Sequence, residues 1–209
     1  MIQILQENDF FIVLNKPPGV SVHNEKPSLL DFLQSQKRPP HFVSRLDRET
    51  SGLMIVAKTA LLHETLSEAL QQGTKTYRAL LRNQWRESES NQWAWPLTDK
   101  AEGRDNPQGK TAERLPCESH VQVIRSNKFF TEAAITILTG RQHQIRKHSA
   151  LAKHPIVGDG RYNDKKYNDM IADRYKISRM WLHAECLQFK LQDQDFKFEN
   201  KINLDTYFS

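Results

Sequence analysis

The chain has 209 residues, enough for one domain with a substantial hydrophobic core or for two small ones. Hydrophobic residues make up 38% and charged residues 26%, which excludes wholesale disorder, and no apolar run approaches the roughly 20 residues of a membrane helix. Thirty Lys and Arg against 25 Asp and Glu give a formal charge of +5, a mild indication of a polyanionic partner.

The cysteines and the first residues argue against several classes of protein. Cys117 and Cys186 are far apart and lack CxxC spacing, which argues against a disulfide scaffold or a cysteine zinc site. Residues 1–9 carry neither a basic segment nor a long apolar stretch, so they do not form a secretory signal. We therefore expect a cytoplasmic protein without membrane attachment.

The first half of the chain predicts alternating strands and helices. Two prolines follow the first strand and enforce a turn over residues 16–19, and Ser28 is placed to cap a short helix. Gly73 lies just past the end of a second helix, whose leucines share one face. The expected strands are residues 10–15, 53–58 and 75–81, and the expected helices start at Ser28 and Thr59.

The second half predicts a sheet with few helices. Residues 98–118 are polar and form a long loop, which tends to be functional or mobile. Residues 161–179 are charged and give no assignment. A hairpin is expected over 121–124 and 129–138, a helix over 144–152, and strands over 183–191 and 196–204. Since strands outnumber helices, we expect an α+β fold with a largely antiparallel sheet, in a single domain over residues 1–209.

Residues 44–53 form the most informative segment, a polar loop that leads into a buried strand. Asp47 is flanked by Arg45 and Arg48. A carboxylate beside arginines stays ionised, and a fixed carboxylate can act as a nucleophile or a base. The alternative is an arginine-bridged loop that only anchors two strands, and composition alone favours it.

A second segment, residues 139–148, is basic. Gly140 ends a strand, and exposed amides at a helix start near Arg141 and Arg146 would suit phosphate contacts. The alternative is a solvated basic helix face. A zinc site is not indicated, because His143 and His148 do not share one helix face and no nearby Asp, Glu or Cys completes a ligand set.

Tyr77 lies in a third segment, an expected strand over residues 75–81. Alternation places its ring on one face of the strand, where it would either stack on a nucleobase or pack in the core. Three nearby tryptophans, Trp85, Trp93 and Trp95, are expected to pack in the core or at an edge of the sheet. The chain contains no GxGxxG, Walker, GxSxG or HExxH motif.

Taken in order, these segments resemble the RluA family of pseudouridine synthases. The family's central motif is HRLDxxTSG, and residues 44–52 read SRLDRETSG, with Ser44 in place of the usual histidine. Further matches are the opening strand and turn at 13–19, the KxYxA strand at 75–79, the GRxHQIRxH and PIxGD segments within 140–159, and LHA at 182–184. The resemblance runs from about Phe10 to Leu191.

The resemblance implies a pseudouridine synthase fold around a central RNA-binding catalytic cleft. It implies an isomerase that converts specific uridines of transfer RNA or ribosomal RNA to pseudouridine by base flipping. It implies neither a cofactor nor a metal, and we expect a monomer. Because the chain starts directly at the catalytic-domain motif, we expect no separate N-terminal RNA-binding domain.

By the same resemblance, Asp47 is the catalytic residue. Tyr77 would stack on the extruded uracil, Arg146 would pair with Asp47, and Arg45 would enter the gap that the flipped base leaves. Arg48 and Arg141 would contact phosphates. Two competing hypotheses are a catalytically inactive RNA-binding module, which predicts a lost aspartate, and a hydrolase that combines Asp47 with His143 or His183 but lacks a second carboxylate or a nucleophile placed by a turn.

Overall fold

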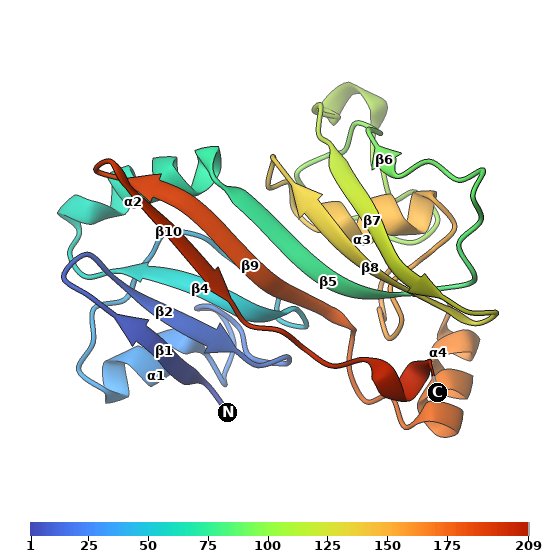
Figure 1. Ribbon diagram of the computed structural model, residues 1–209, viewed down its shortest axis with the longest axis horizontal. Helices are drawn as coiled ribbons and strands as arrows, with labels where there is room; N and C mark the ends of the chain where they lie inside the picture. The colour runs from blue at the N-terminus through green and yellow to red at the C-terminus, as the bar shows by residue number, and fades with distance from the viewer. Residues whose placement is uncertain (209) are drawn as a thin grey trace. The chain divides into compact units, whose positions relative to one another are not determined.

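The computed structural model describes residues 1–208, which fold as two compact units (Figure 1). The first unit combines Met1–Lys75 with His183–Lys201, and the second combines Thr76–Leu182 with the chain end from Ile202. Each unit is therefore built from two separate segments of the chain. None of the helices within residues 1–208 is both long enough and apolar enough to cross a membrane.

The sheet of the first unit has the order β1-β2-β4-β9, with β10 on β9 and β3 on β4. All of these pairs are antiparallel except β4 with β9, which run parallel over a short register. The strands are β1 Gln3–Glu7, β2 Phe11–Lys16, β3 His41–Phe42, β4 Ser51–Ala57, β9 Leu182–Leu191 and β10 Gln194–Glu199.

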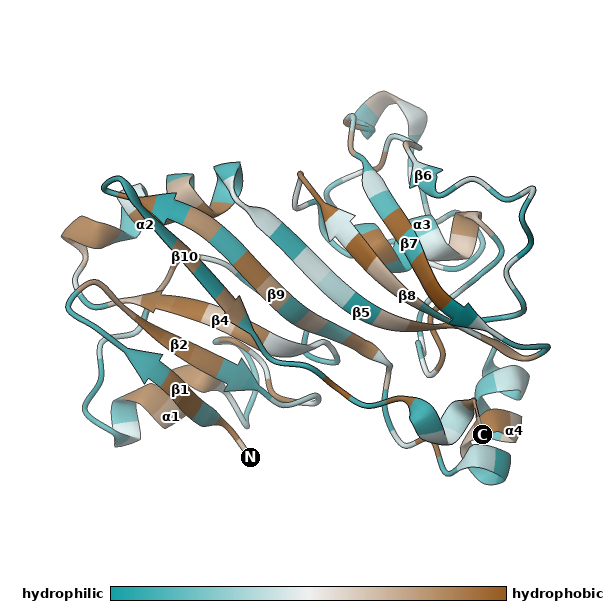
Figure 2. Ribbon diagram, in the orientation of Figure 1, coloured by the Kyte–Doolittle hydropathy of each residue, from teal (hydrophilic) through white to brown (hydrophobic). Residues whose placement is uncertain are grey.

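Two helices explain why β2 and β4 read as continuous apolar runs. Leucines of α2 (Leu61–Gln72) pack with Phe11 and Val13, whereas leucines of α1 (Leu29–Ser35) pack with Ile12 and Leu14. Alternate residues of β2 thus contribute to two different cores, and a strand that is buried on both faces needs apolar residues at every position. Figure 2 shows the result as a mostly brown β4 beside an alternating β9.

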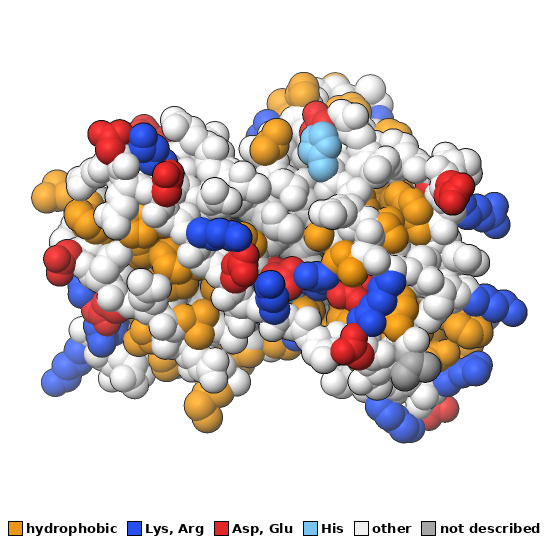
Figure 3. Space-filling model, viewed as in Figure 1, with side chains coloured by type: hydrophobic (Ala, Val, Ile, Leu, Met, Phe, Trp, Pro, Cys, Tyr) orange, Lys and Arg blue, Asp and Glu red, His pale blue; other side chains and the backbone are white. Residues whose placement is uncertain are grey.

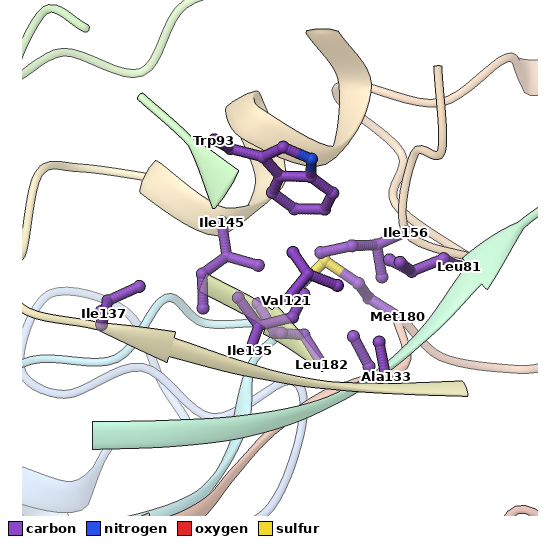
Figure 4. Packing of buried hydrophobic residues seen from close by; sticks show 11 residues of the cluster. Leu81, Trp93, Val121, Ala133, Ile135, Ile137, Ile145, Ile156, Met180 and Leu182 are labelled. Carbon is purple, nitrogen blue, oxygen red and sulfur yellow. The ribbon is translucent and has the colours of Figure 1, made fainter. Parts of the chain in front are cut away.

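The second unit has a sheet in the order β5-β8-β7-β6. Ile145 of α3 packs with Trp93, Val121 and Ile135, which closes the core of this unit on one side (Figure 4). The elements are β5 Thr74–Arg82, β6 Gln92–Trp93, β7 Ser119–Ser126, β8 Phe130–Ile137, α3 Gln144–Leu151, α4 Lys165–Tyr175 and the short 3₁₀ helices Thr111–Glu113 and Asp205–Tyr207.

Ion pairs link neighbouring strands of the second unit. Arg78 of β5 and Arg125 of β7 both bind the Glu132 carboxylate on β8, and Arg125 also binds Asp205. On the face that Figure 3 shows, acidic and basic side chains lie next to one another in this part of the molecule. These arginines are paired within the protein, so they do not form a uniformly basic surface.

The predicted α+β class with a largely antiparallel sheet is confirmed, and most elements lie where the sequence placed them. Ser28 caps α1 through a hydrogen bond from the Asp31 amide to its hydroxyl. The last strand is shorter than expected, because β10 ends at Glu199 rather than Leu204. The unassigned region contains α4, whose N-cap is Asp164.

Gly52 lies where the backbones of β4 and β9 approach each other closely. Its φ is +116°, and a Cβ there would lie 2.3 Å from the Ala184 carbonyl oxygen and 2.6 Å from the Ala184 nitrogen. The parallel register of β4 on β9 pairs Ser51 with His183 and Gly52 with Ala184. The glycine of the TSG segment is therefore required by its contact with the backbone of the LHA segment.

We predict that Gly52→Ala lowers the free energy of unfolding by about 3 kcal/mol or more, since it adds positive-φ strain to overpacking against the backbone. Urea denaturation measures the change. Gly103→Ala is the matched control, because nothing lies within 4 Å of that position and its φ is ordinary. Equal stability of the two variants would contradict this account of the Gly52 contact.

Candidate active site

Asp47 begins a tight turn that leads directly into β4. The Thr50 amide donates to the Asp47 carbonyl at 3.1 Å, and Ser51 is the first residue of the strand. The Asp47 side chain is half-buried, so its carboxylate sits at the boundary between protein and solvent. A carboxylate in that position is held by the protein and still reachable by a large substrate.

A buried ammonium group fixes the backbone next to Asp47. Lys16 is fully buried, and its Nζ donates to the carbonyl oxygens of Arg48 at 3.0 Å, Val20 at 2.8 Å and Pro17 at 3.2 Å. The Gly19 amide donates to the same Arg48 oxygen at 2.8 Å. A buried charge is tolerated only when hydrogen bonds satisfy it. The hydrogen bonds from Lys16 to these carbonyls therefore fix the turn next to the end of β2.

Beyond the turn, Ser51 is held by a histidine from the other end of the chain. Its hydroxyl lies 2.7 Å from His183 Nδ1, and His183 Nε2 lies 2.7 Å from the Asn200 carbonyl oxygen. Both side chains are buried. The sequence showed these residues only as parts of two separate motifs, and nothing in their spacing indicated that they meet.

The two arginines beside Asp47 differ in their surroundings. Arg48 donates from Nε to the Gly19 carbonyl at 3.1 Å, and its guanidinium pairs with Glu25. Arg45 is exposed and makes no hydrogen bond or ion pair within the described part of the chain. An arginine-bridged loop would need both arginines to hold the turn, but Arg48 and Lys16 hold it without Arg45.

In the second unit, Arg146 is buried and held in a fixed orientation. Its Nε and Nη2 bind the two oxygens of Asp159 at 2.8 Å and 2.9 Å, and its guanidinium lies 5.4 Å from the Tyr162 ring centre. Asp159 is itself fully buried and also accepts from the backbone amides of Arg161 and Tyr162. A bidentate pair of this kind fixes the plane of the guanidinium as well as its position.

The basic segment of residues 139–148 leads into α3. It is neither the solvated basic helix face nor the set of exposed amides that the sequence suggested. Residues 144–149 are all buried, so α3 is not a solvated basic helix. The amides at its start are not exposed for phosphate either, because the Asp99 carboxylate accepts from the Gln142 amide at 2.7 Å and the Gln144 side chain accepts from the Arg141 amide. Arg141 itself is half-buried, and its Nε has no hydrogen-bond partner among the described residues.

Tyr77 lies on β5, where its ring is half-buried against the core of the second unit. Its neighbours Thr76 and Arg78 bind Thr136 and Glu132 of β8, respectively. Neighbouring residues of a strand point to opposite faces, so these side chains are directed away from the Tyr77 ring. Contact with the core restricts the orientation of the ring and leaves part of it accessible.

Two buried basic side chains of α3 bind the chain segment that contains Trp95 and Thr98. Lys147 Nζ donates to the Thr98 carbonyl at 2.8 Å. His148 lies between the Trp95 carbonyl, 2.9 Å from Nε2, and the Ser119 hydroxyl, 2.9 Å from Nδ1. Burial lowers the pKa of His148, and the neighbouring Lys147 charge adds to the effect. Within residues 1–208, no three His, Cys, Asp or Glu side chains are arranged to hold a metal ion.

The six predicted site residues thus divide between the units. Arg45, Asp47 and Arg48 share one turn segment of the first unit, whereas Tyr77, Arg141 and Arg146 belong to the second. The pairing of Arg146 with Asp47 and all six functional roles stay predictions. The residues that orient this set, Lys16, Asp159 and His183, became apparent only from the folded chain.

Comparison with known proteins identifies the family. Residues 10–151 match the family described as RNA pseudouridylate synthase, and the chain belongs to this family. The sequence is 37% identical over 199 residues to ribosomal large subunit pseudouridine synthase C of Escherichia coli strain K12, which covers 89% of this chain and 61% of that protein. The chain therefore spans about 61% of the length of this curated relative. The resemblance to the RluA type is confirmed.

Two solved human structures share the fold. Human RNA pseudouridylate synthase domain containing 1 superposes with a TM-score of 0.78 at 23% identity, over 97% of this chain and 84% of that one. Human RNA pseudouridylate synthase domain containing 4 gives 0.79 at 21% identity, over 98% and 90%. At this level of identity the likeness confirms the pseudouridine synthase fold.

We predict that His148 makes the stability of the protein depend on pH. Its pKa in the folded chain lies below the ordinary value of 6.5, so the unfolded chain binds more protons as the pH falls below about 6.5. The contribution of the neutral His148 to the free energy of unfolding is therefore fully present above about pH 6.5 and decreases below it. Urea denaturation at several pH values between about 5 and 7 should show a shallower loss for His148→Gln than for the unmodified protein. Parallel curves would contradict the prediction.

Proposed function

We propose that this protein isomerises uridine to pseudouridine in RNA, with Asp47 as the reacting carboxylate. The observation that carries the proposal is the family's aspartate, present as Asp47 in a turn that Lys16 holds from within the protein. The inactive binding module predicted a lost aspartate, and Asp47 is present. The positive formal charge of +5 is consistent with a polyanionic substrate.

The reaction needs only bond exchange at one nucleotide. The N1–C1′ bond breaks, the uracil rotates, and a C5–C1′ bond forms, after which C5 loses its proton and N1 gains one. An ionised Asp47 has three ways to start this sequence: attack at C1′, addition to the base at C6, or removal of the 2′ proton. All three use the same half-buried carboxylate and need neither a redox step nor a further reactant.

The remaining site residues prepare the nucleotide for that step. Chemistry on a base in a folded RNA requires the base to leave the stack, at a cost of a few kcal/mol. We assign Tyr77 to stack on the flipped uracil and the exposed Arg45 to fill the gap it leaves. From the family resemblance we further propose that Arg146, whose guanidinium Asp159 orients, is the partner of Asp47.

The phosphate contacts come from the other predicted arginines. We assign a phosphate contact to Arg141, whose side chain is half-buried. Arg48 contributes less than the sequence suggested, because Glu25 already neutralises it. Ser44 removes the imidazole that usually opens the motif, whereas Thr50, Lys16 and Gly19 make the hydrogen bonds that hold the turn.

The substrate class that we propose is ribosomal RNA, following the name of the curated relative. We further propose that residues 1–209 form a single catalytic domain that acts as a monomer in the cytoplasm. The test is tritium release from [5-³H]uridine-labelled RNA taken from cells that lack the gene, because bonding at C5 expels that hydrogen. We expect release from ribosomal RNA. Release from transfer RNA alone would correct the substrate, and tight RNA binding without release from any RNA would overturn the function.

A variant pair at Tyr77 tests the stacking role. Tyr77→Phe keeps the ring and should retain most turnover, whereas Tyr77→Ala loses a stack worth about 1–3 kcal/mol and should be far slower. The assay is tritium release under saturating RNA, at a temperature where thermal melts show both variants folded. Equal losses in the two variants would assign the role of Tyr77 to its hydroxyl instead.

A further inference from the structure

A buried hydrogen-bonded chain connects the end of the Asp47 turn to the C-terminal part of the first unit. Ser51 Oγ, His183 and the Asn200 carbonyl follow one another with separations of 2.7 Å at each end of the imidazole. Ser51 is 2% exposed and His183 is 3% exposed. Neither the proposed chemistry nor the core packing accounts for polar groups at these buried positions.

The partners of the ring define which nitrogen carries the proton. A carbonyl oxygen can only accept a hydrogen bond, so Nε2 of His183 donates to Asn200. In the neutral ring Nδ1 is then an acceptor, and the Ser51 hydroxyl donates to it. With a neutral ring the chain runs in one direction, from Ser51 through the imidazole to the backbone at Asn200.

The location of Ser51 gives this chain a consequence for Asp47. Lys16 fixes the carbonyl of Arg48, one residue after Asp47, and Ser51 lies four residues after it, at the start of β4. The Thr50 amide, which lies between Arg48 and Ser51, closes the turn by donating to the Asp47 carbonyl. The backbone that directly follows Asp47 is thus held at two points, by the Lys16 ammonium at Arg48 and by His183 at Ser51.

We propose that the hydrogen bond from Ser51 to His183 positions the Asp47 carboxylate for reaction, which makes His183 a positioning residue that does not touch the RNA. This inference rests on the proposed function. A misplacement of about 1 Å in a reacting group can cost about a hundredfold in rate. Loss of the hydrogen bond between Ser51 and His183 should therefore lower the turnover number strongly. RNA binding uses other residues and should stay the same.

The experiment compares variants that break the chain at different bonds. Ser51→Ala removes the donor. His183→Asn keeps an acceptor oxygen near the position of Nδ1, and His183→Gln keeps a donor near the position of Nε2. Each protein is assayed by tritium release from [5-³H]uridine-labelled ribosomal RNA, with kcat and KM measured separately and thermal melts recorded. Ser28→Ala is the matched control, since it removes a buried serine hydroxyl of the same unit that caps α1.

We expect Ser51→Ala and His183→Gln to lose roughly ten- to a hundredfold in kcat with little change in KM. His183→Asn should retain most of the activity, and Ser28→Ala should melt earlier without a loss of kcat. In a double-mutant cycle, adding Ser51→Ala to His183→Gln should cost little more than either change alone. A kcat that simply follows melting temperature across all four variants, or an unchanged kcat in Ser51→Ala, would overturn the proposal.

A spectroscopic measurement separates this inference from the proposed function. Nitrogen chemical shifts of His183 in the wild-type protein should show a neutral ring with the proton on Nε2, and Ser51→Ala should shift the Nδ1 signal. A proton on Nδ1 would overturn the hydrogen-bond assignment whatever the enzyme does. A wild-type protein with the expected tautomer but no tritium release would overturn the proposed function, and the positioning role with it.

Discussion

The buried ammonium of Lys16 is the interaction on which the arrangement around Asp47 depends. It sits at the end of β2 and satisfies three carbonyl oxygens, one of which belongs to the residue after Asp47. Hydrogen bonds to a charged donor are stronger than those between neutral groups, and a buried charge without them would be costly. The first unit therefore cannot bury Lys16 without also building the turn that holds the carboxylate, and fold and site are stabilised together.

The second unit uses the same kinds of contact. Lys147 places a buried ammonium on the Thr98 carbonyl, as Lys16 does on Arg48. His148 lies between the Ser119 hydroxyl and the Trp95 carbonyl, the arrangement that His183 makes with Ser51 and Asn200. In both units, buried cations and histidines fix irregular backbone that strands and helices do not stabilise. These polar groups hold loops, which explains why Lys16, Lys147, His148 and His183 are buried rather than solvated.

Periodicity and turn chemistry predicted most of the fold, because those signals are local. The apolar runs of β2 and β4, the Ser28 cap and the hairpin of β7 and β8 were all placed close to their observed positions. The weakly amphipathic α4 was not assigned, since one buried residue, Ile171, is too little for a pattern. Burial of α3 and the pairing of Arg146 with Asp159 depend on contacts between distant segments, which spacing alone does not reveal. The six candidate residues came from three sequence segments, whereas the residues that orient them required the three-dimensional structure.

The most direct measurement compares Asp47→Asn with the unmodified protein in both RNA affinity and tritium release. The substitution is nearly isosteric and keeps an acceptor oxygen, so the turn held by Lys16 should form and the variant should melt as a folded protein. If the carboxylate reacts, tritium release from labelled ribosomal RNA disappears while the affinity for that RNA is retained. A folded Asp47→Asn protein that releases tritium at nearly the wild-type rate would contradict the account, because the turn would then hold a residue that takes no part in the chemistry.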